Sequence, residues 1–205
     1  MRPSSLLLAS ACALLAACAP DLRTDFPFDG AAPDDGQSHF TFEPQGNGVL
    51  QTVVDATHKE YWVYLDLDAQ QEISGAEALG TKDWDIAFQR FKIISNSGVD
   101  GVGDVEVAVL PGQDFDALTT APAQGYLRDA PDGPDSNADV DSAFLVDDGW
   151  YAYDLLKHKV APYDNVYVVH TASAYYKLKI LAYYDAAGTA GKITFLWAPV
   201  AAPSP

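Results

Sequence analysis

The sequence predicts a single all-β domain of mainly antiparallel strands and hairpins, with at most one or two short helices. Two observations lead to this prediction. Several runs of the chain alternate apolar and polar residues with a period of two, which is the pattern of a half-buried strand. Other apolar runs are rich in β-branched and aromatic side chains, which favour strands over helices.

The first half of the domain is predicted to hold three strands. Residues 61–68 and 84–89 alternate in the expected way, and residues 105–109 carry valine at every second position. The sequence Ser95-Asn96-Ser97-Gly98 follows the second run and has the residue types that a tight reversal needs. Gln113 to Thr120 is predicted to form a short helix that Pro122 stops.

The second half is predicted to hold four more strands. One begins at Trp150, and two β-branched and aromatic runs cover residues 165–171 and 192–197. Between them, residues 175–184 alternate strictly, with Tyr176, Leu178 and Ile180 on the more apolar face. We expect the connection over residues 157–164 to close a hairpin between the Trp150 strand and the strand that follows.

The N-terminus predicts export and lipid anchoring. An apolar run over residues 6–17 is shorter than the roughly 20 residues that span a bilayer, but it fits the apolar part of a secretory signal. The run ends in Leu15-Ala16-Ala17-Cys18, the pattern of a bacterial lipobox, in which cleavage precedes Cys18 and the cysteine carries lipid. Ala19 follows the cysteine and favours the outer membrane as the destination.

These features divide the chain into four parts. We expect a lipoprotein signal peptide at 1–17, then lipidated Cys18 with a flexible linker at 18–38 that is rich in Pro, Asp, Gly and Ala. One β domain at 39–198 follows, and an Ala/Pro tail occupies 199–205.

Charge and cysteine content exclude several kinds of function. The chain has 12 Lys and Arg against 29 Asp and Glu, and such an acidic protein lacks the basic surface that nucleic acid requires. Cys12 leaves with the signal peptide and Cys18 carries lipid in this scheme, so no thiol remains for a disulfide, a cysteine-ligated metal or thiol catalysis. Phosphate-binding loops and hydrolase or zinc-protease motifs are also absent from the sequence.

Several short motifs follow one another in a characteristic order. The sequence Trp84-Asp-Ile-Ala-Phe is followed by Asn96-Ser-Gly, and the motif at Gly149-Trp150 by further strand motifs. The chain thereby resembles the HmuY-like family of bacterial lipoproteins, whose studied members bind haem. The resemblance covers most of residues 61–197 and implies a non-catalytic haem-binding protein with an HmuY-like fold.

The resemblance also directs attention to the histidines. Haem-binding members clamp the iron between two side chains, His or in some cases Met. Met1 is the only methionine and leaves with the signal, so a protein ligand must come from a histidine or, less commonly, a tyrosine. The histidines are His39, His58, His158 and His170.

His158 is the predicted haem-iron ligand, and His170 is the second predicted haem-binding residue. His158 follows the Gly-Trp strand, in the region from which the family draws one ligand. The family's other ligand lies in the loop before Gly-Trp, here residues 129–148, which contain no His or Met. Alternatively, His158 is a solvated loop residue, His170 faces solvent or accepts a hydrogen bond, and His39 and His58 are structural.

Spacing argues against one iron shared by both predicted residues. If residues 157–164 form the hairpin, His170 lies opposite Tyr151, and His158 is about 23 Å further along the ladder at ~3.3 Å per residue. Two axial nitrogens on one metal are only about 4 Å apart, because metal–nitrogen bonds are ~2 Å long. We therefore expect at most one of the two histidines to ligate the iron.

Two further features leave alternatives open. Asp135, Asn137, Asp139 and Asp141 are spaced by two, as in calcium loops, but Val140 and Val146 stand where that loop needs Gly and Glu, which favours a flexible acidic loop. The tyrosines that we expect in an aromatic pocket wall are Tyr151, Tyr153, Tyr183 and Tyr184.

The sequence thus predicts a membrane-anchored lipoprotein that binds haem or a related porphyrin for iron acquisition. Its expected partners are the porphyrin, the lipid bilayer through Cys18 and an outer-membrane receptor. The alternative is a protein module of the same fold that has lost haem ligation and binds another partner or small ligand.

Overall fold

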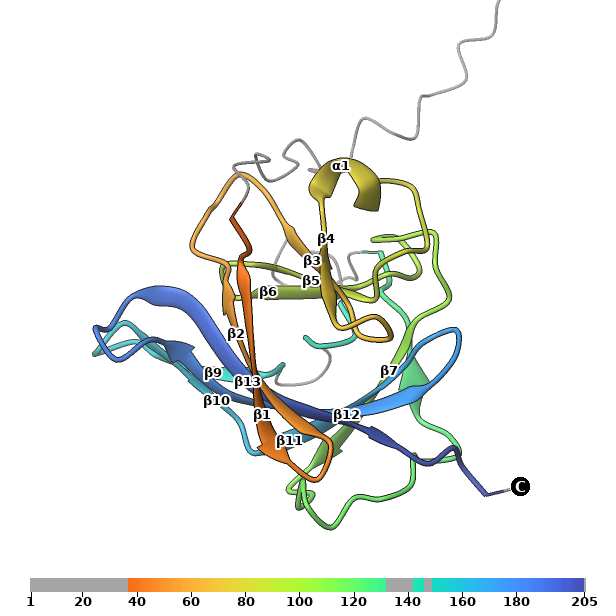
Figure 1. The fold of residues 1–205 in the computed structure, drawn as a ribbon. Helices are drawn as coiled ribbons and strands as arrows, with labels where there is room; N and C mark the ends of the chain where they lie inside the picture. Colours follow the sequence, from red (N-terminus) through yellow and green to blue (C-terminus); the bar gives the residue numbers. More distant parts are fainter. Residues whose placement is uncertain (1–36, 132–141, 146–148, 205) are drawn as a thin grey trace, which may run out of the picture.

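The structure is a computed structural model that describes residues 37–131, 142–145 and 149–204. The all-β prediction is confirmed, because the described residues form thirteen strands and one short α-helix (Figure 1). Every pair of neighbouring strands in the sheets is antiparallel. The predicted signal peptide and Cys18 lie outside the described residues.

A seven-stranded sheet forms the larger layer. In spatial order its strands are β1 (Phe40–Gly46), β2 (Val49–Asp55), β13 (Ala190–Val200), β12 (Tyr175–Tyr184), β11 (Asn165–His170), β7 (Glu106–Pro111) and β8 (Tyr126–Leu127). The three runs predicted as strands near the C-terminus are therefore neighbours in the middle of this sheet. β13 continues to Val200 and Ala201 bridges Thr120, so residues 199–201, which we expected in the tail, belong to the folded region.

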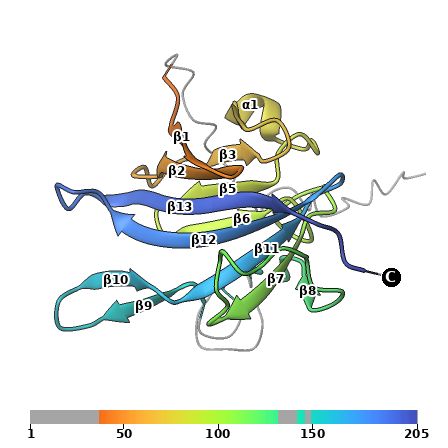
Figure 2. The same cartoon turned by 60° about the horizontal axis from the view of Figure 1, so that its bottom comes forward.

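The smaller layer is a four-stranded sheet. In spatial order its strands are β4 (Gln71–Ile73), β3 (Val63–Asp66), β5 (Ile86–Gln89) and β6 (Lys92–Ser95). A separate hairpin is formed by β9 (Tyr151–Asp154) and β10 (Lys159–Pro162). Figure 2 shows this hairpin extending from one side of the molecule. Among the described residues, no helix has the length and apolar character needed to cross a membrane.

The main core lies between the two sheets. Phe88 of β5 stacks on Phe195 of β13 with ring centroids 5.5 Å apart, and Leu65 and Ile86 are fully buried in the same cluster. Trp150 is also buried in this core and donates a hydrogen bond from its indole nitrogen to the Phe91 carbonyl at 2.8 Å. The period-two pattern of the sequence thus supplies one apolar face to the core.

The other face of the small sheet is buried as well. A second apolar cluster there contains Trp62, Tyr64, Ile73, Ala78, Trp84, Ala87 and Ile94. Ala78 belongs to the helix α1 (Gly75–Ala78), whose first residues are capped by Ser74, with a reciprocal contact between the Ser74 and Glu77 side chains. The helix and the adjoining loops therefore cover a face that an isolated sheet would expose.

The predicted helix at Gln113–Thr120 is wrong: these residues form turns and irregular chain. Lys177 reaches this segment from β12 and donates hydrogen bonds to the carbonyls of Phe115 and Leu118 at 2.7 and 3.0 Å. Phe115 packs with Val166 and Ala198 on the outer face of the large sheet. Lys177 and Phe115 thus hold this segment on the sheet. Lys177 binds carbonyls that in a helix would accept hydrogen bonds from backbone nitrogens of the same helix.

The predicted pairing of the Trp150 strand is also wrong. β9 pairs with β10, so Tyr151 lies opposite Pro162. β11 pairs with β12 and β7 instead, which places His170 opposite Tyr175 and Glu106. The tight turn falls at residues 155–158, earlier than expected, because Asp154 accepts hydrogen bonds from the backbone nitrogens of Leu156 and Lys157.

Candidate functional site

The turn between β9 and β10 exposes two leucines and a histidine. Asp154 and Lys159 are the last paired residues of the hairpin, and His158 adopts a left-handed conformation with φ of 51° to close the turn. Leu155 and Leu156 are 76% and 93% exposed. Apolar side chains exposed together in this way are typical of binding surfaces. We call residues 153–159 the hairpin tip.

His158 is oriented by a neighbouring tyrosine. Its Nδ1 lies 3.0 Å from the hydroxyl of Tyr153, and both side chains are exposed. A phenol on Nδ1 leaves Nε2 as the nitrogen that can coordinate a metal, and such a partner fixes the ring of a ligating histidine. Lys157 and Lys159 add positive charge to the hairpin tip of an acidic protein.

The hairpin tip combines an imidazole with apolar and basic side chains. The tip presents one imidazole, two exposed leucines and two ammonium groups. The ammonium group of Lys157 pairs with Asp154 at 3.3 Å, and that of Lys159 lies 5.8 Å from the centre of the Tyr184 ring. The sequence analysis selected His158, a role that stays a prediction, and did not single out Leu155, Leu156 or the two lysines. The two consecutive leucines in a charged turn are a sequence signal for an exposed apolar surface, because they lie on no strand or helix face that could bury them.

His170 lies elsewhere. Its ring stacks on Tyr175 with centroids 4.1 Å apart, packs against Tyr126 of β8, and has Nδ1 3.6 Å from a carboxylate oxygen of Glu106. Figure 2 shows β8 and the turn between β9 and β10 on opposite sides of the molecule. The structure therefore does not bring His158 and His170 together.

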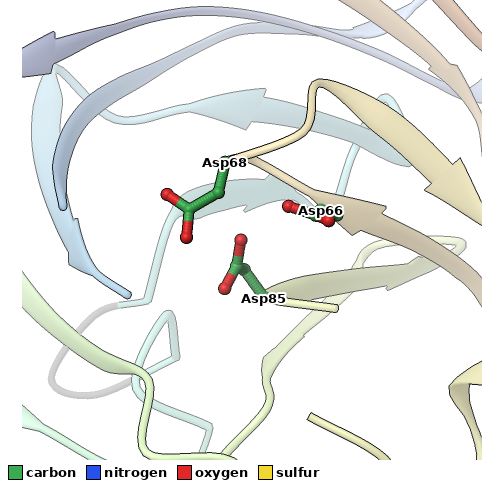
Figure 3. Close-up of side chains that lie close together, drawn as sticks. All are labelled: Asp66, Asp68 and Asp85. Atoms are coloured by element: carbon green, nitrogen blue, oxygen red, sulfur yellow. The ribbon is translucent and has the colours of Figure 1, made fainter. Parts of the chain in front are cut away.

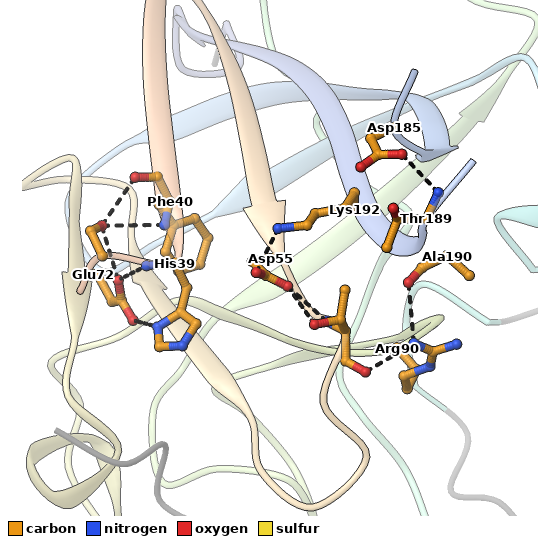
Figure 4. Close-up of polar contacts among 11 residues, drawn as sticks. His39, Phe40, Asp55, Glu72, Arg90, Asp185, Thr189, Ala190 and Lys192 are labelled. Carbon is orange, nitrogen blue, oxygen red and sulfur yellow. Dashed lines mark hydrogen bonds and ion pairs between the residues drawn. The ribbon is translucent and has the colours of Figure 1, made fainter. Parts of the chain in front are cut away.

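The two remaining histidines have structural partners. His39 places Nδ1 2.6 Å from a Glu72 carboxylate oxygen and also bonds Glu72 through its backbone nitrogen, which ties the start of β1 to β4 (Figure 4). His58 is exposed and stacks on Tyr61 with centroids 4.2 Å apart.

Most of the predicted pocket-wall tyrosines lie near the base of the hairpin. Tyr151 packs edge-on against Trp150 and Phe91, and Tyr183 packs edge-on against Tyr184. The Tyr184 hydroxyl accepts a hydrogen bond from the Val160 backbone nitrogen at 3.0 Å. These three tyrosines pack at the base of the hairpin, whereas Tyr153 is the one of the four at the hairpin tip.

One group of three carboxylates occurs among the described residues. Asp66, Asp68 and Asp85 place oxygen atoms within 4.8 Å of one another (Figure 3). Asp85 accepts a hydrogen bond from the Leu67 backbone nitrogen. Asp68 accepts hydrogen bonds from Thr171 and Ser173 in the turn between β11 and β12 and from Tyr176 of β12. Burial raises the pKa of Asp85 to about 7. These bonds account for the group as a link between the two sheets.

The predicted acidic loop falls largely outside the described residues, including Asp135, Asn137, Asp139 and Asp141. Its first residue, Asp129, is buried and accepts hydrogen bonds from the backbone nitrogens of Ser95 and Ala143, both at 2.7 Å. Asp129 thus anchors the beginning of the loop to β6 and to the short segment at 142–145.

The family assignment follows from comparison with known proteins. The family model described as HmuY protein matches residues 58–197. The chain belongs to the HmuY family. No curated protein is a significant match.

Solved structures share the HmuY fold at low identity. A provisionally assigned HmuY-like haem-binding protein of Bacteroides vulgatus has a TM-score of 0.58 and 18% identity, covering 79% of this chain and 97% of its own. An apo HmuY analogue of Tannerella forsythia has a TM-score of 0.55 and 18% identity over 83% and 100% of the two chains. A provisionally assigned lipoprotein of Bacteroides fragilis has a TM-score of 0.57 and 20% identity over 78% and 95%.

Proposed function

We propose that this HmuY-family protein is a non-catalytic, lipid-anchored protein of the cell envelope that binds haem or a related porphyrin for iron acquisition. The hairpin tip carries the proposal, because His158 stands there between exposed leucines and lysines. Family membership and the haem-binding neighbour from Bacteroides vulgatus support it. The lipobox ending at Cys18 and the lipoprotein neighbour support anchoring, with the outer membrane as the proposed location and an outer-membrane receptor as a partner.

The hairpin tip would hold the porphyrin through three kinds of contact. His158 Nε2 would ligate the iron while Tyr153 holds the ring in place. Leu155 and Leu156 would cover the apolar macrocycle, and burial of each leucine stabilises by about 1.5–3 kcal/mol. Lys157 or Lys159 would pair with the propionates. One described histidine at the site implies five-coordinate iron, or a sixth ligand from outside the described residues.

The first test is a haemin titration of the protein followed by the Soret band. We expect a saturable one-to-one shift that His158→Ala abolishes. His58→Ala is the matched control, because His58 is exposed and distant in the sequence from the tip, and His170→Ala should also leave the shift unchanged. A wild-type spectrum no different from that of an unrelated acidic protein would rule out haem binding.

The contribution of Leu155 and Leu156 is tested separately from that of the proposed iron ligand, His158. Leu155→Ser and Leu156→Ser together should weaken haemin binding by roughly tenfold or more, because about 1.4 kcal/mol of lost apolar contact corresponds to a tenfold change. Leu181→Ser removes a leucine of the large sheet that is 43% exposed and should have no effect. Equal affinity in all these variants would place the porphyrin away from the tip.

The second candidate function is a binding module of the same fold without haem ligation. It is favoured by the absence of a second histidine at the tip among the described residues and of His or Met from residues 129–148. It predicts no Soret shift in the titration above, so the same experiment separates the two functions.

A further inference from the structure

A recess on the outer side of the four-stranded sheet has the size of a small-molecule site. Its volume is about 620 Å³, within the usual range of ligand pockets. α1, the chain after it and the loop between β6 and β7 enclose it. Figures 1 and 2 both show α1 and the β9–β10 hairpin on different sides of the domain, so this recess is separate from the hairpin tip.

The wall of the recess is aromatic and held in place. Tyr64 and Trp84 meet edge to face with centroids 5.0 Å apart, and the Trp84 indole nitrogen donates to the Ala78 carbonyl at 3.0 Å. Leu79 and Val102 at its rim are 45% and 53% exposed. Leu79 and Val102 thus supply the exposed apolar surface, while Tyr64 and Trp84, only 2% and 3% exposed, form the fixed floor of the recess.

The loop side of the wall is fixed by Asn96. Its amide donates to the carbonyls of Thr81 and Trp84 at 3.0 and 2.8 Å and accepts from the Gly103 nitrogen at 2.8 Å. A Cβ on Gly101 would collide with the Asn96 side chain, so the loop packs this closely only with glycine there. The polar groups of Asn96 are therefore used internally and are not available to a ligand.

Among the described residues that line the recess, Asp100 carries a buried polar atom without a hydrogen-bond partner. The residue is only 8% exposed and lines the recess, and its Oδ2 has no hydrogen-bond donor within reach. Its carboxyl lies close to that of Asp129, and Lys92 is the cation that acts on it. Two neighbouring buried carboxyls repel one another when both are charged, so the pair favours a proton or a further cation beside Lys92.

We propose that this recess binds a small amphipathic organic amine, with its apolar body between Leu79 and Val102, over the floor that Trp84 forms, and its ammonium group on Asp100. The strongly acidic chain would favour the approach of a cation over that of an anion.

The test compares three probes of one shape: 2-phenylethylamine, 2-phenylethanol and 3-phenylpropionate. Binding to the full chain is measured by calorimetry and by saturation-transfer NMR. We expect the amine to bind about tenfold or more tightly than the alcohol, since one charge-assisted hydrogen bond is worth at least ~1.4 kcal/mol, and the acid not to bind. Equal binding of amine and acid, or no binding of the amine at millimolar concentration, overturns the proposal.

Three variants locate the binding. Asp100→Asn should remove the preference for the amine over the alcohol, and Val102→Trp should fill the recess and weaken both probes. Asp104→Asn removes an exposed carboxylate from the same loop and should change neither. An unchanged preference in Asp100→Asn would contradict the proposal. None of the three should alter the haemin titration, so failure here and failure of haem binding are distinguishable.

Discussion

Asn96 shows what the motif Trp84-Asp to Asn96-Ser-Gly does at the scale of single residues. Its fully buried side chain binds three backbone groups, the carbonyls of Thr81 and Trp84 and the nitrogen of Gly103. Asp85 caps the Leu67 nitrogen, and Gly98 lies against the backbone of Asp129. Buried backbone groups need such partners, so the motif is a set of matched donors and acceptors that holds the loop between β6 and β7.

Gly98 gives a prediction at this scale. Gly98 and Gly112 have similar φ values of 59° and 66°, but a Cβ on Gly98 would collide with the Asp129 carbonyl, whereas one on Gly112 would meet nothing within 4 Å. Gly112→Ala should therefore lower the free energy of unfolding by about 1 kcal/mol, from backbone strain alone. Gly98→Ala should cost roughly 3 kcal/mol or more in urea unfolding. Equal losses would mean that the Asp129 backbone moves away freely.

At the scale of elements, Asp68 joins two turns that belong to different sheets. It follows β3 and accepts hydrogen bonds from Ser173 and Tyr176 at 2.7 and 2.8 Å and from Thr171 at 3.1 Å. The connection from β11 to β12 is thereby fixed against the end of the small sheet. Burial and the adjacent Asp68 raise the pKa of Tyr176, as expected for a phenol that donates to a carboxylate.

Removing Asp68 should loosen this contact between the layers. We expect Asp68→Ala to lower the free energy of unfolding by about 2–3 kcal/mol, because hydrogen bonds to a charged group are the stronger ones. Asp83→Ala, at an exposed position of the same sheet's connecting loop, should change it by less than about 0.5 kcal/mol. A double-mutant cycle with Tyr176→Phe should give a coupling energy of about 0.5–1.5 kcal/mol, and additivity would contradict the link.

For the whole molecule, buried carboxyl groups set the pH dependence of stability. Burial raises the pKa of Asp85 to about 7 and that of Asp129 to about 6, and burial together with the Asp129 charge raises that of Asp100 to about 7. An unfolded Asp has a pKa of about 3.9, so each group holds its proton more tightly in the folded state. This contribution to stability is fully present below about pH 4 and is lost as the pH rises through 6 to 7.

We therefore expect the melting temperature to rise as the pH is lowered from 8 to 5. Asp100→Asn should flatten this rise, because the amide keeps the shape of the side chain and removes one titrating group and its repulsion of Asp129. Asp83→Asn, at an exposed carboxylate, serves as the control for net charge. A melting temperature that falls steadily between pH 8 and pH 5 in the wild type would contradict the assignment. Salt-bridged Asp55, whose pKa is lowered despite burial, adds an opposite effect only at lower pH.

The sequence by itself determined the fold class and the family. Period-two alternation predicted the strands around Leu65, Phe88 and Leu178, because the side chains of a strand point alternately to its two faces. The order of the motifs around Trp84, Asn96 and Trp150 indicated the family, and the contacts of Asn96 depend on that particular residue type. The family resemblance selected His158, after the Trp150 strand, as the iron ligand, and that role stays a prediction.

Only the tertiary structure decided which strands pair and which groups meet. Tyr151 pairs with Pro162 rather than His170, since hairpin partners depend on where the turn closes, and Asp154 closes it early. The segment at Gln113–Thr120 does not form the predicted helix, because Lys177, distant in sequence, binds two of its carbonyls. The meeting of Asp100 with Asp129 and the recess beside Trp84 likewise arise from long-range packing, which a pattern of neighbouring residues does not encode.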